Sequence, residues 1–297
     1  GFAAHAFAPL WPVFAAGAAL IGLGSGAVDA ALNAFVAREF SARQMNWLHA
    51  CYSAGAWIGP LLMAAAIHRG SWRGGYAVLG AVLLALAGVF ILTSSRWGRP
   101  AAPGAAGDAG AGAALRHPRV RLQMAVFFVY TGLESTFGAW AYTVLVEGRG
   151  LAHATAVGWV ALYFGALAAG RVLFGIVVGR WNPDRLVRAG AWGAATGAAL
   201  FAVGPETVQG ASLGLVGLSL APVFPCLMAR TPDRVGHAAA VHAIGFQVSA
   251  ATLGAALCPA LGGLLSDAAG LRAVPVEAVV LAALLCALHE RLLLGDR

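Results

Sequence analysis

Nine apolar stretches of about 20 residues each fill most of this 297-residue chain, and short segments rich in arginine separate them. The hydrocarbon core of a bilayer is about 30 Å thick, so a helix needs roughly 20 residues to cross it. Backbone polar groups find no water there, and each crossing must satisfy its own hydrogen bonds as a helix. The sequence therefore predicts an all-α, multi-pass membrane protein.

The composition excludes a soluble globular domain, because 60% of the residues are hydrophobic, 10% are charged and the mean hydropathy is +0.78. The formal net charge is +7, and all 19 basic residues behind it are arginines. These arginines lie between the apolar segments rather than in one basic patch. We therefore expect the lipid bilayer, and not nucleic acid, to be a partner. The four cysteines lie singly in apolar segments, without the spacing of metal ligands, so we expect no metal and no cofactor.

The predicted crossings share an apolar body, with ends that are uncertain by a few residues. They cover 11 to 36, 46 to 67, 74 to 94, 122 to 146, 154 to 179, 187 to 204, 208 to 229, 237 to 265 and 273 to 293. Residues 1 to 9 are interpreted as the tail of a tenth, earlier crossing. The first residue is glycine and no charged region precedes the first apolar stretch, so we expect a cut end rather than a signal peptide.

The arginines divide unequally between the two membrane faces that these crossings imply. Of the 19, 14 fall on one face and four on the other, while Arg171 lies inside a crossing. Because cytoplasmic connections carry the excess of positive charge, the first face is predicted to be cytoplasmic, together with the C-terminus.

Residues 96 to 118 form the one long hydrophilic connection, and their Gly, Ala and Pro content predicts a flexible linker. Three crossings precede it and six follow. GAWIGPLL at 55 to 62 aligns with GAALCPAL at 254 to 261, which indicates either two homologous bundles or a chance similarity in a chain rich in Ala and Gly. We expect a partial N-terminal bundle at 1 to 95, a cytoplasmic linker at 96 to 118 and a C-terminal six-helix bundle at 119 to 297.

Five segments in order resemble the Major Facilitator Superfamily, nearest to its fucose-permease-like branch of sugar:proton symporters. They are GLGSGAVDAALNAFVAREF (22 to 40), MNWLHACYSAGAWIGPLL (45 to 62), YTGLESTFGAW (130 to 140), GRVLFG (170 to 175) and LAPVFPCLMARTPDRVGHAAAVHAIGFQ (220 to 247). The resemblance implies a fold in which two helical bundles rock about a central site. It also implies that the chain enters near the end of the third of twelve helices, so that this chain alone is incomplete as a transporter.

Polar residues inside the crossings are the candidates for a site, because charged and polar groups are expensive in the membrane. Asp29 lies nine residues before Arg38, which places it about 13 Å below the helix end, and Asn33 is one turn away. The resemblance implies that this acid and this amide line the transport cavity. A structural hydrogen bond between helices is the alternative for Asp29.

His49 and Tyr52 match cavity-lining positions of the resembling proteins, where the place of the histidine is commonly an amide. Imidazole titrates near neutral pH, so His49 is a candidate for proton coupling as well as for a substrate hydrogen bond. Gln247 on the penultimate helix offers both donors and acceptors to a cavity. Asn46 and His242 are nearer the cytoplasmic side and are expected to be structural.

Glu134 and Arg171 lie at similar depth on consecutive crossings and are expected to form an ion pair. Two interpretations stay open: a static pair that locks two helices, and a pair that breaks or is protonated during transport. Tyr130 shares the helix of Glu134 and is expected either to stack against a sugar or to pack. In GRWNPDRL at 179 to 186, Gly179 takes the usual acidic place of a superfamily loop motif, which puts a gating role in doubt.

Other functions fit the sequence less well. Ser25 in GLGSGA gives half of a superficial match to an intramembrane serine protease, but no suitably placed histidine in a matching motif accompanies it. A receptor or scaffold of the same fold is opposed by the mid-membrane polar residues.

The sequence thus predicts a monomeric, proton-coupled secondary transporter of a small polar solute, for example a sugar, in an inner (plasma) membrane. The alternative is a proton-driven exporter of drugs or metabolites. The predicted substrate-binding or coupling residues are Asp29, Asn33, His49, Tyr52, Glu134 and Gln247, with Arg171 as the partner of Glu134.

Overall fold

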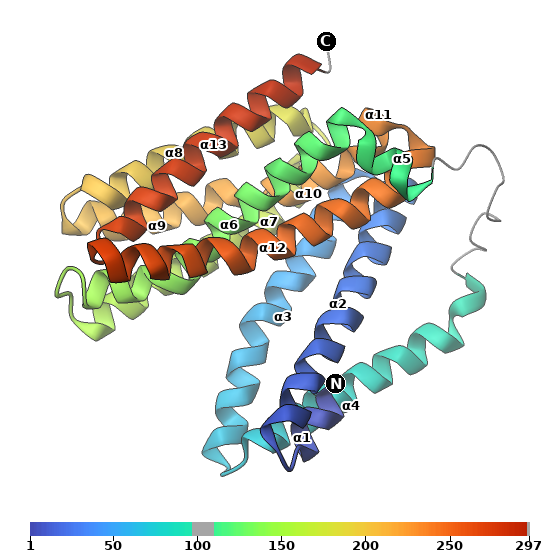
Figure 1. Ribbon diagram of the computed structural model, residues 1–297, viewed down its shortest axis with the longest axis horizontal. Helices are drawn as coiled ribbons and strands as arrows, with labels where there is room; N and C mark the ends of the chain where they lie inside the picture. Colours follow the sequence, from blue (N-terminus) through green and yellow to red (C-terminus); the bar gives the residue numbers. More distant parts are fainter. Residues whose placement is uncertain (97–109, 296–297) are drawn as a thin grey trace. The chain divides into compact units, whose positions relative to one another are not determined.

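A computed structural model describes residues 1–96 and 110–295 of the chain, and the side chains of residues 57, 60, 61 and 64 are not described. Within these residues the regular structure consists of helices, with no strand (Figure 1). The prediction of an all-α protein is confirmed.

The long helices coincide with the predicted crossings. They are α2 (Trp11–Glu39), α3 (Ala42–His68), α4 (Trp72–Leu92), α6 (Pro118–Val146), α7 (His153–Val177), α8 (Pro183–Val203), α9 (Glu206–Leu220), α12 (His237–Ala269) and α13 (Ala273–Gly295). Shorter elements are α1 (Phe2–Phe7), the 3-10 turn η1 (Ser94–Arg96), α5 (Ala111–Arg116), α10 (Val223–Ala229) and α11 (Thr231–Val235). Agreement at this level follows from the length and hydropathy of the segments.

Seven spans of the described chain are long and apolar enough to cross a membrane. They are α2, α4, α7, α8, α12, α13 and the segment Glu206–Ala229, which includes both α9 and α10. Neither α3 nor α6 is among them, although both have the length of a crossing. These two helices carry His49 and Ser53, and Tyr130 and Glu134, respectively.

One predicted crossing, 208 to 229, is divided into two helices. The chain leaves α9 at Leu220 and resumes as α10 at Val223, with a turn at Ala221 and Pro222 between them. Proline has no backbone N–H, and its ring clashes with the preceding turn of a helix, so Pro222 explains the break. Carbonyls at the end of α9 are left for donors from other helices.

Part of the predicted linker is helical, which corrects the expectation of a flexible connection through 96 to 118. Residues 111–116, AGAALR, form α5, and Ala114 is buried. Alanine and leucine have high helix propensity, and α5 packs against α12. The remainder of that linker, 97 to 109, lies outside the described residues.

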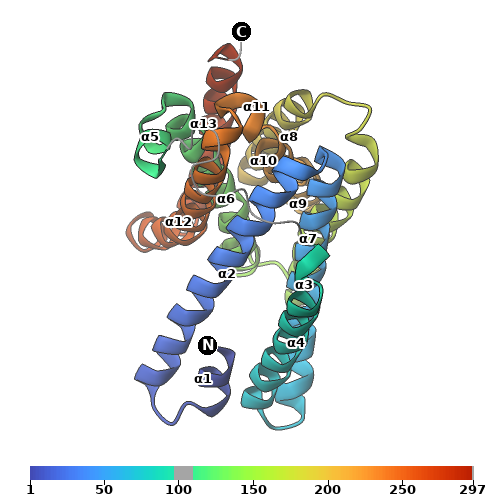
Figure 2. The ribbon, with the colours of Figure 1, turned by 90° about the vertical axis from the view of Figure 1, so that its right-hand side faces the viewer.

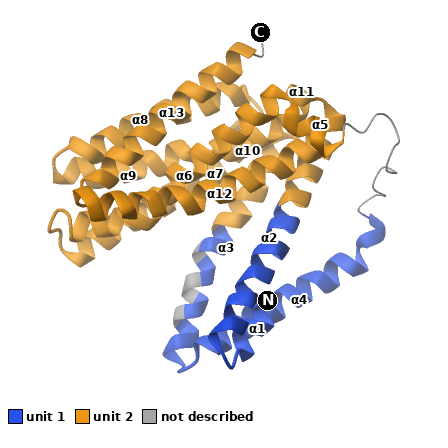
Figure 3. Cartoon of the chain, in the orientation of Figure 1, with its two compact units in different colours: residues 1–29, 54–108 blue, residues 30–53, 109–297 orange. Residues whose placement is uncertain are grey.

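The chain divides into two compact units, coloured separately in Figure 3. Unit 1 consists of residues 1–29 and 54–108, and its helix α1 packs against α4. There His5 stacks on Phe14 with ring centroids 3.8 Å apart, and Tyr76 meets His5 edge-on at 4.7 Å. An open cavity of about 690 Å³ lies beside this aromatic cluster and is lined in part by Trp11 and Trp72.

Unit 2 consists of residues 30–53 and 109–297 and contains most of the buried core. In it α6 packs against α12 and α13, α7 against α9, and α8 against α9 and α13; Figures 1 and 2 both show α6 and α12 side by side. Glycine permits the closest approach: a Cβ atom on Gly254 of α12 would lie 2.0 Å from the carbonyl oxygen of Phe128 on α6. Small residues that let backbones touch are typical of membrane helix interfaces.

Candidate functional site

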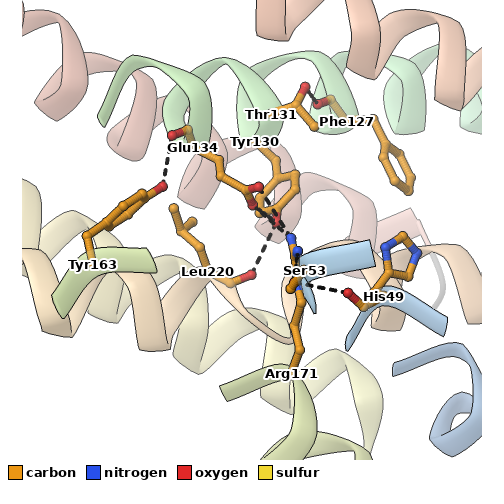
Figure 4. Close-up of polar contacts among 9 residues, drawn as sticks. All are labelled: His49, Ser53, Phe127, Tyr130, Thr131, Glu134, Tyr163, Arg171 and Leu220. Atoms are coloured by element: carbon orange, nitrogen blue, oxygen red, sulfur yellow. Dashed lines mark hydrogen bonds and ion pairs between the residues drawn. The ribbon is translucent and has the colours of Figure 1, made fainter. Parts of the chain in front are cut away.

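An ion pair between Glu134 and Arg171 lies at the centre of a polar cluster inside unit 2. Arg171 Nη2 is 3.3 Å from each carboxylate oxygen of Glu134 (Figure 4). The Arg171 side chain is 4% exposed and that of Glu134 is 22% exposed. The two residues come from α6 and α7, and the structure brings them together as the ion pair that the sequence indicated. Because neither charge is well solvated, each depends on the other for compensation.

Two tyrosines fix the position of Glu134. The Tyr130 hydroxyl, one turn earlier on α6, donates to Glu134 Oε2 and lies 3.3 Å from the Leu220 carbonyl oxygen. Leu220 ends α9 at the Pro222 break, so that break supplies an acceptor to the cluster. Tyr163 of α7 donates from its hydroxyl to the backbone oxygen of Glu134 at 2.8 Å. Both tyrosines are fully buried, and the carboxylate is held in one orientation.

Ser53 of α3 joins the cluster from a third helix. Arg171 Nη1 donates to Ser53 Oγ, and Ser53 Oγ donates to the carbonyl oxygen of His49 at 3.0 Å (Figure 4). The guanidinium therefore links α3 to α6 through two of its nitrogens. Tyr52, the neighbour of Ser53, is exposed, and its ring centroid lies 6.0 Å from Arg171 Cζ, at the limit of a cation–π contact.

His49 and Asn33 form a second polar contact in the same unit. His49 Nε2 lies 3.1 Å from Asn33 Oδ1, and both side chains are buried. An amide oxygen only accepts, so His49 Nε2 is the donor in this contact. The His49 ring packs against Phe224 at 4.6 Å.

The two remaining predicted residues are Asp29 and Gln247. Asp29 is the last residue of the first stretch of unit 1 and is partly buried. Gln247 is fully buried in unit 2, where its Nε2 donates to Gln123 Oε1 at 3.0 Å and its Oε1 accepts from Thr231 at 3.1 Å. These bonds join α12 to α6 and α11, and within the described part of the chain neither of them involves Glu134 or Arg171.

The GRWNPDRL segment forms the beginning of α8. Asn182 caps the helix by accepting from the Asp184 backbone N–H at 2.8 Å, and Pro183 occupies the first turn. Asp184 pairs with Arg230 at 3.2 Å and with Arg234 at 2.5 Å. All of these residues belong to unit 2, so the ion pairs tie α8 to α10 and α11 within one unit.

Sequence reasoning missed several members of the cluster. Ser53 and Tyr163 were not singled out, and Tyr130 was expected to stack or pack rather than to donate to Glu134. A serine one turn after His49, and a tyrosine eight residues before Arg171 on the same helix, are the signals that could have found the first two. No group of three His, Cys, Asp or Glu side chains that could hold a metal ion occurs within residues 1–96 and 110–295.

Comparisons with known proteins agree with this architecture. The model of the Major Facilitator Superfamily matches residues 1–247. The structure of FucP, a Major Facilitator Superfamily transporter in the outward conformation, superposes with a TM-score of 0.80 at 18% identity, covering 98% of this chain and 80% of that one. A variant of the Escherichia coli fucose:proton symporter FucP gives 0.79 at 19% identity, covering 98% and 81%.

The human organic anion transporter MFSD10 (TETRAN) gives a TM-score of 0.75 at 18% identity, covering 98% of this chain and 73% of that one. These identities establish the fold alone. None of the curated proteins compared with the chain matches it. Because the family model covers more than half of the sequence and the helices repeat the same fold, the chain belongs to the Major Facilitator Superfamily of membrane transporters.

Proposed function

We propose that this protein moves a small polar solute across a membrane by alternating access of two helical bundles, and that protons drive the movement. The observation that carries the proposal is the ion pair of Glu134 and Arg171, in which the Tyr130 hydroxyl donates to Glu134 and the Ser53 hydroxyl accepts from Arg171. A transporter needs a group that gains and loses a proton inside the membrane, and intramembrane carboxylates are the usual carriers.

The pair suits a coupling role because protonation of Glu134 changes what Arg171 can bind. A neutral carboxylic acid attracts the guanidinium far less than a carboxylate does. Arg171 also donates to Ser53 of α3, so the loss of one partner alters the link between α3 and α6. A solute hydroxyl could then replace Glu134 as an acceptor.

Hydrogen-bonding capacity near the pair favours a polar solute. Asn33, His49 and Tyr52 offer amide, imidazole and phenol groups within unit 2, and we propose them as binding groups together with Asp29 and Gln247. Two of the proteins with a similar fold are a fucose:proton symporter and an organic anion transporter, and fucose and organic anions are both polar solutes.

We further propose that residues 1 to 95 and 119 to 297 belong to the two bundles, joined by the linker at 96 to 118. The protein is proposed to be a monomer of an inner membrane with its C-terminus in the cytoplasm, which the distribution of arginines supports. Fusion of a reporter that is active only in the cytoplasm to the C-terminus tests the orientation. An inactive reporter on a correctly inserted protein would contradict it.

Transport itself is tested with the protein reconstituted in proteoliposomes and a panel of labelled monosaccharides, with and without an imposed proton gradient. We expect gradient-dependent accumulation in the wild type. In Glu134→Gln we expect accumulation to be lost, while exchange of solute across the membrane is retained, because the amide keeps the shape but carries no titrating proton.

The matched control is Glu206→Gln, which changes an exposed carboxylate in the first turn of α9 and is expected to leave accumulation unchanged. If Glu134→Gln accumulates solute as the wild type does, Glu134 is not the coupling group. If no sugar enters and an apolar dye is expelled instead, the protein is an exporter on the same fold.

A further inference from the structure

Glu277 of α13 is a buried carboxyl group that the proposed transport cluster does not use. Its side chain is 7% exposed, and neither carboxylate oxygen has a hydrogen-bond partner among the described residues. The other partly buried carboxylates among the described residues of unit 2 are different: Glu134 pairs with Arg171, Asp184 with Arg234, and Glu290 with Arg188 at 2.6 Å. Glu277 is thus buried without compensation.

Helices α12 and α6 both approach Glu277, and no basic side chain among the described residues forms a hydrogen bond with its carboxylate. Gly262 of α12 is so close that a Cβ atom there would lie 2.5 Å from Glu277 Oε2 and 3.4 Å from Trp140 Nε1 of α6. The indole N–H of Trp140 is already used, since it donates to the Pro259 carbonyl oxygen at 2.9 Å. The carboxyl group therefore faces glycine and an aromatic edge.

The titratable groups described on α6, α8 and α12, the helices packed against α13, form no ion pair with Glu277. On α12 the nearby group is the Cys258 thiol, which packs against Gly132 of α6. On α6 the acid is Glu134, whose carboxylate is engaged by Arg171. On α8, Arg188 pairs with Glu290, 13 residues beyond Glu277, and Asp184 interacts with the neighbouring His289 of α13.

An ionised carboxylate in such surroundings is far more costly than a neutral carboxylic acid. Within a membrane the cost of the charge is removed by binding a proton. We propose that Glu277 carries a bound proton and forms a proton site of the bundle made by α6, α12 and α13, separate from the ion-paired Glu134. Trp140 lies six residues after Glu134 on α6, so the two sites are offset by about 9 Å along that helix.

The test is infrared spectroscopy of the protein in lipid nanodiscs at neutral pH, and it needs no transported solute. A neutral carboxylic acid has a carbonyl stretching band distinct from the bands of a carboxylate and an amide. We expect this band in the wild type and its loss in Glu277→Gln. Glu290→Gln removes an ion-paired carboxylate from the same helix and is expected to leave the band unchanged.

Stability gives a second readout. Glutamine has the size and the neutrality of the protonated acid, so Glu277→Gln is expected to unfold at the same temperature as the wild type. If Glu277 were ionised and paired, the substitution would lower that temperature. A wild type without the carboxylic acid band, or a band that persists in Glu277→Gln, would overturn the proposal.

Two further variants keep the test valid if Glu277→Gln does not fold. Glu277→Asp retains an acid and should shift the band without abolishing it. Gly262→Ala places a methyl group against Glu277 Oε2 and should shift it as well, whereas Gly245→Ala on the same helix faces open space and should not. A band unaffected by both Glu277→Asp and Gly262→Ala belongs to another residue, which contradicts the assignment.

The infrared result for Glu277 and the transport result for Glu134→Gln are independent, so either proposal can fail while the other holds.

Discussion

The contacts of Arg171 require the planar shape of the guanidinium as well as its charge. Its guanidinium donates to Glu134 of α6 from Nη2 and to Ser53 of α3 from Nη1. A planar fork with several donors can serve two acceptors in different directions, whereas a lysine ammonium acts as a single point charge on a flexible stem. The residue is therefore suited to hold two helices in a defined arrangement.

Removal of this charge is expected to be costly. Arg171→Met leaves Glu134 buried beside apolar atoms, and loss of one partner of a buried pair costs about 3–5 kcal/mol of unfolding free energy. Addition of Glu134→Gln should recover part of that loss, because no charge is then left unpaired. Unfolding of the purified variants in detergent, arranged as a double-mutant cycle, measures the coupling between the two residues.

Arg188→Met provides the control, because Arg188 is 54% exposed and its pair with Glu290 resembles a surface pair. Such pairs contribute about 0–1 kcal/mol. If Arg171→Met and Arg188→Met lower the unfolding free energy equally, the pair of Glu134 and Arg171 contributes no more to stability than a surface pair does.

At the level of elements, the break between α9 and α10 adds a backbone carbonyl group to the cluster around Glu134 and Arg171. An unbroken helix through residues 220 to 224 would keep its carbonyls bonded internally. Because Pro222 interrupts it, the Leu220 carbonyl oxygen lies open beside the Tyr130 hydroxyl, at 3.3 Å, as a second acceptor next to Glu134 for the one proton of that hydroxyl. The irregular backbone lies inside the protein, where such breaks are tolerated in membrane helices.

The contact between α6 and α12 is expected to be sensitive to a single methyl group. Gly254→Ala places a Cβ atom 2.0 Å from the Phe128 carbonyl oxygen, a separation that requires the helices to move apart. Overpacking of this kind costs about 1–3 kcal/mol. Thermal unfolding of Gly254→Ala, compared with the wild type, measures the loss.

Gly245→Ala is the matched control on α12, because a Cβ atom there meets nothing within 4 Å. Alanine favours the helix over glycine by about 0.5–1 kcal/mol, so this variant should be as stable as the wild type or slightly more stable. If the two alanine variants unfold alike, backbone contact does not set the spacing of α6 and α12.

Across the whole molecule, the sequence predicted where helices occur far better than which side chains meet. Length and hydropathy are enough to locate crossings, because the bilayer imposes them, and each predicted crossing is helical. The rotation of each helix is set by packing, and lipid tails are as apolar as leucine, so hydropathy carries little information about it. The bond from Tyr163 to the Glu134 backbone and the burial of Glu277 depend on that rotation.

Charged residues inside the crossings were the side chains whose partners the sequence predicted best. Glu134 and Arg171 could be matched by depth alone, because an unpaired ion in the membrane is costly. The break after Leu220 was only partly predictable: prolines at positions 222 and 225 are typical of a bent helix, but they do not show that the helix ends and leaves a carbonyl oxygen beside Tyr130. Gln247 was visible as an amide in an apolar helix, but its partners Gln123 and Thr231 were not.

The closest approach of α6 and α12, at Gly254, rests on main-chain atoms and a glycine, so substitution of side chains outside the contacts between these two helices need not change it. Positions facing a transported solute can then change identity while the scaffold keeps its dimensions. New selectivity can in this way arise by one substitution at a time, without a compensating change in the core.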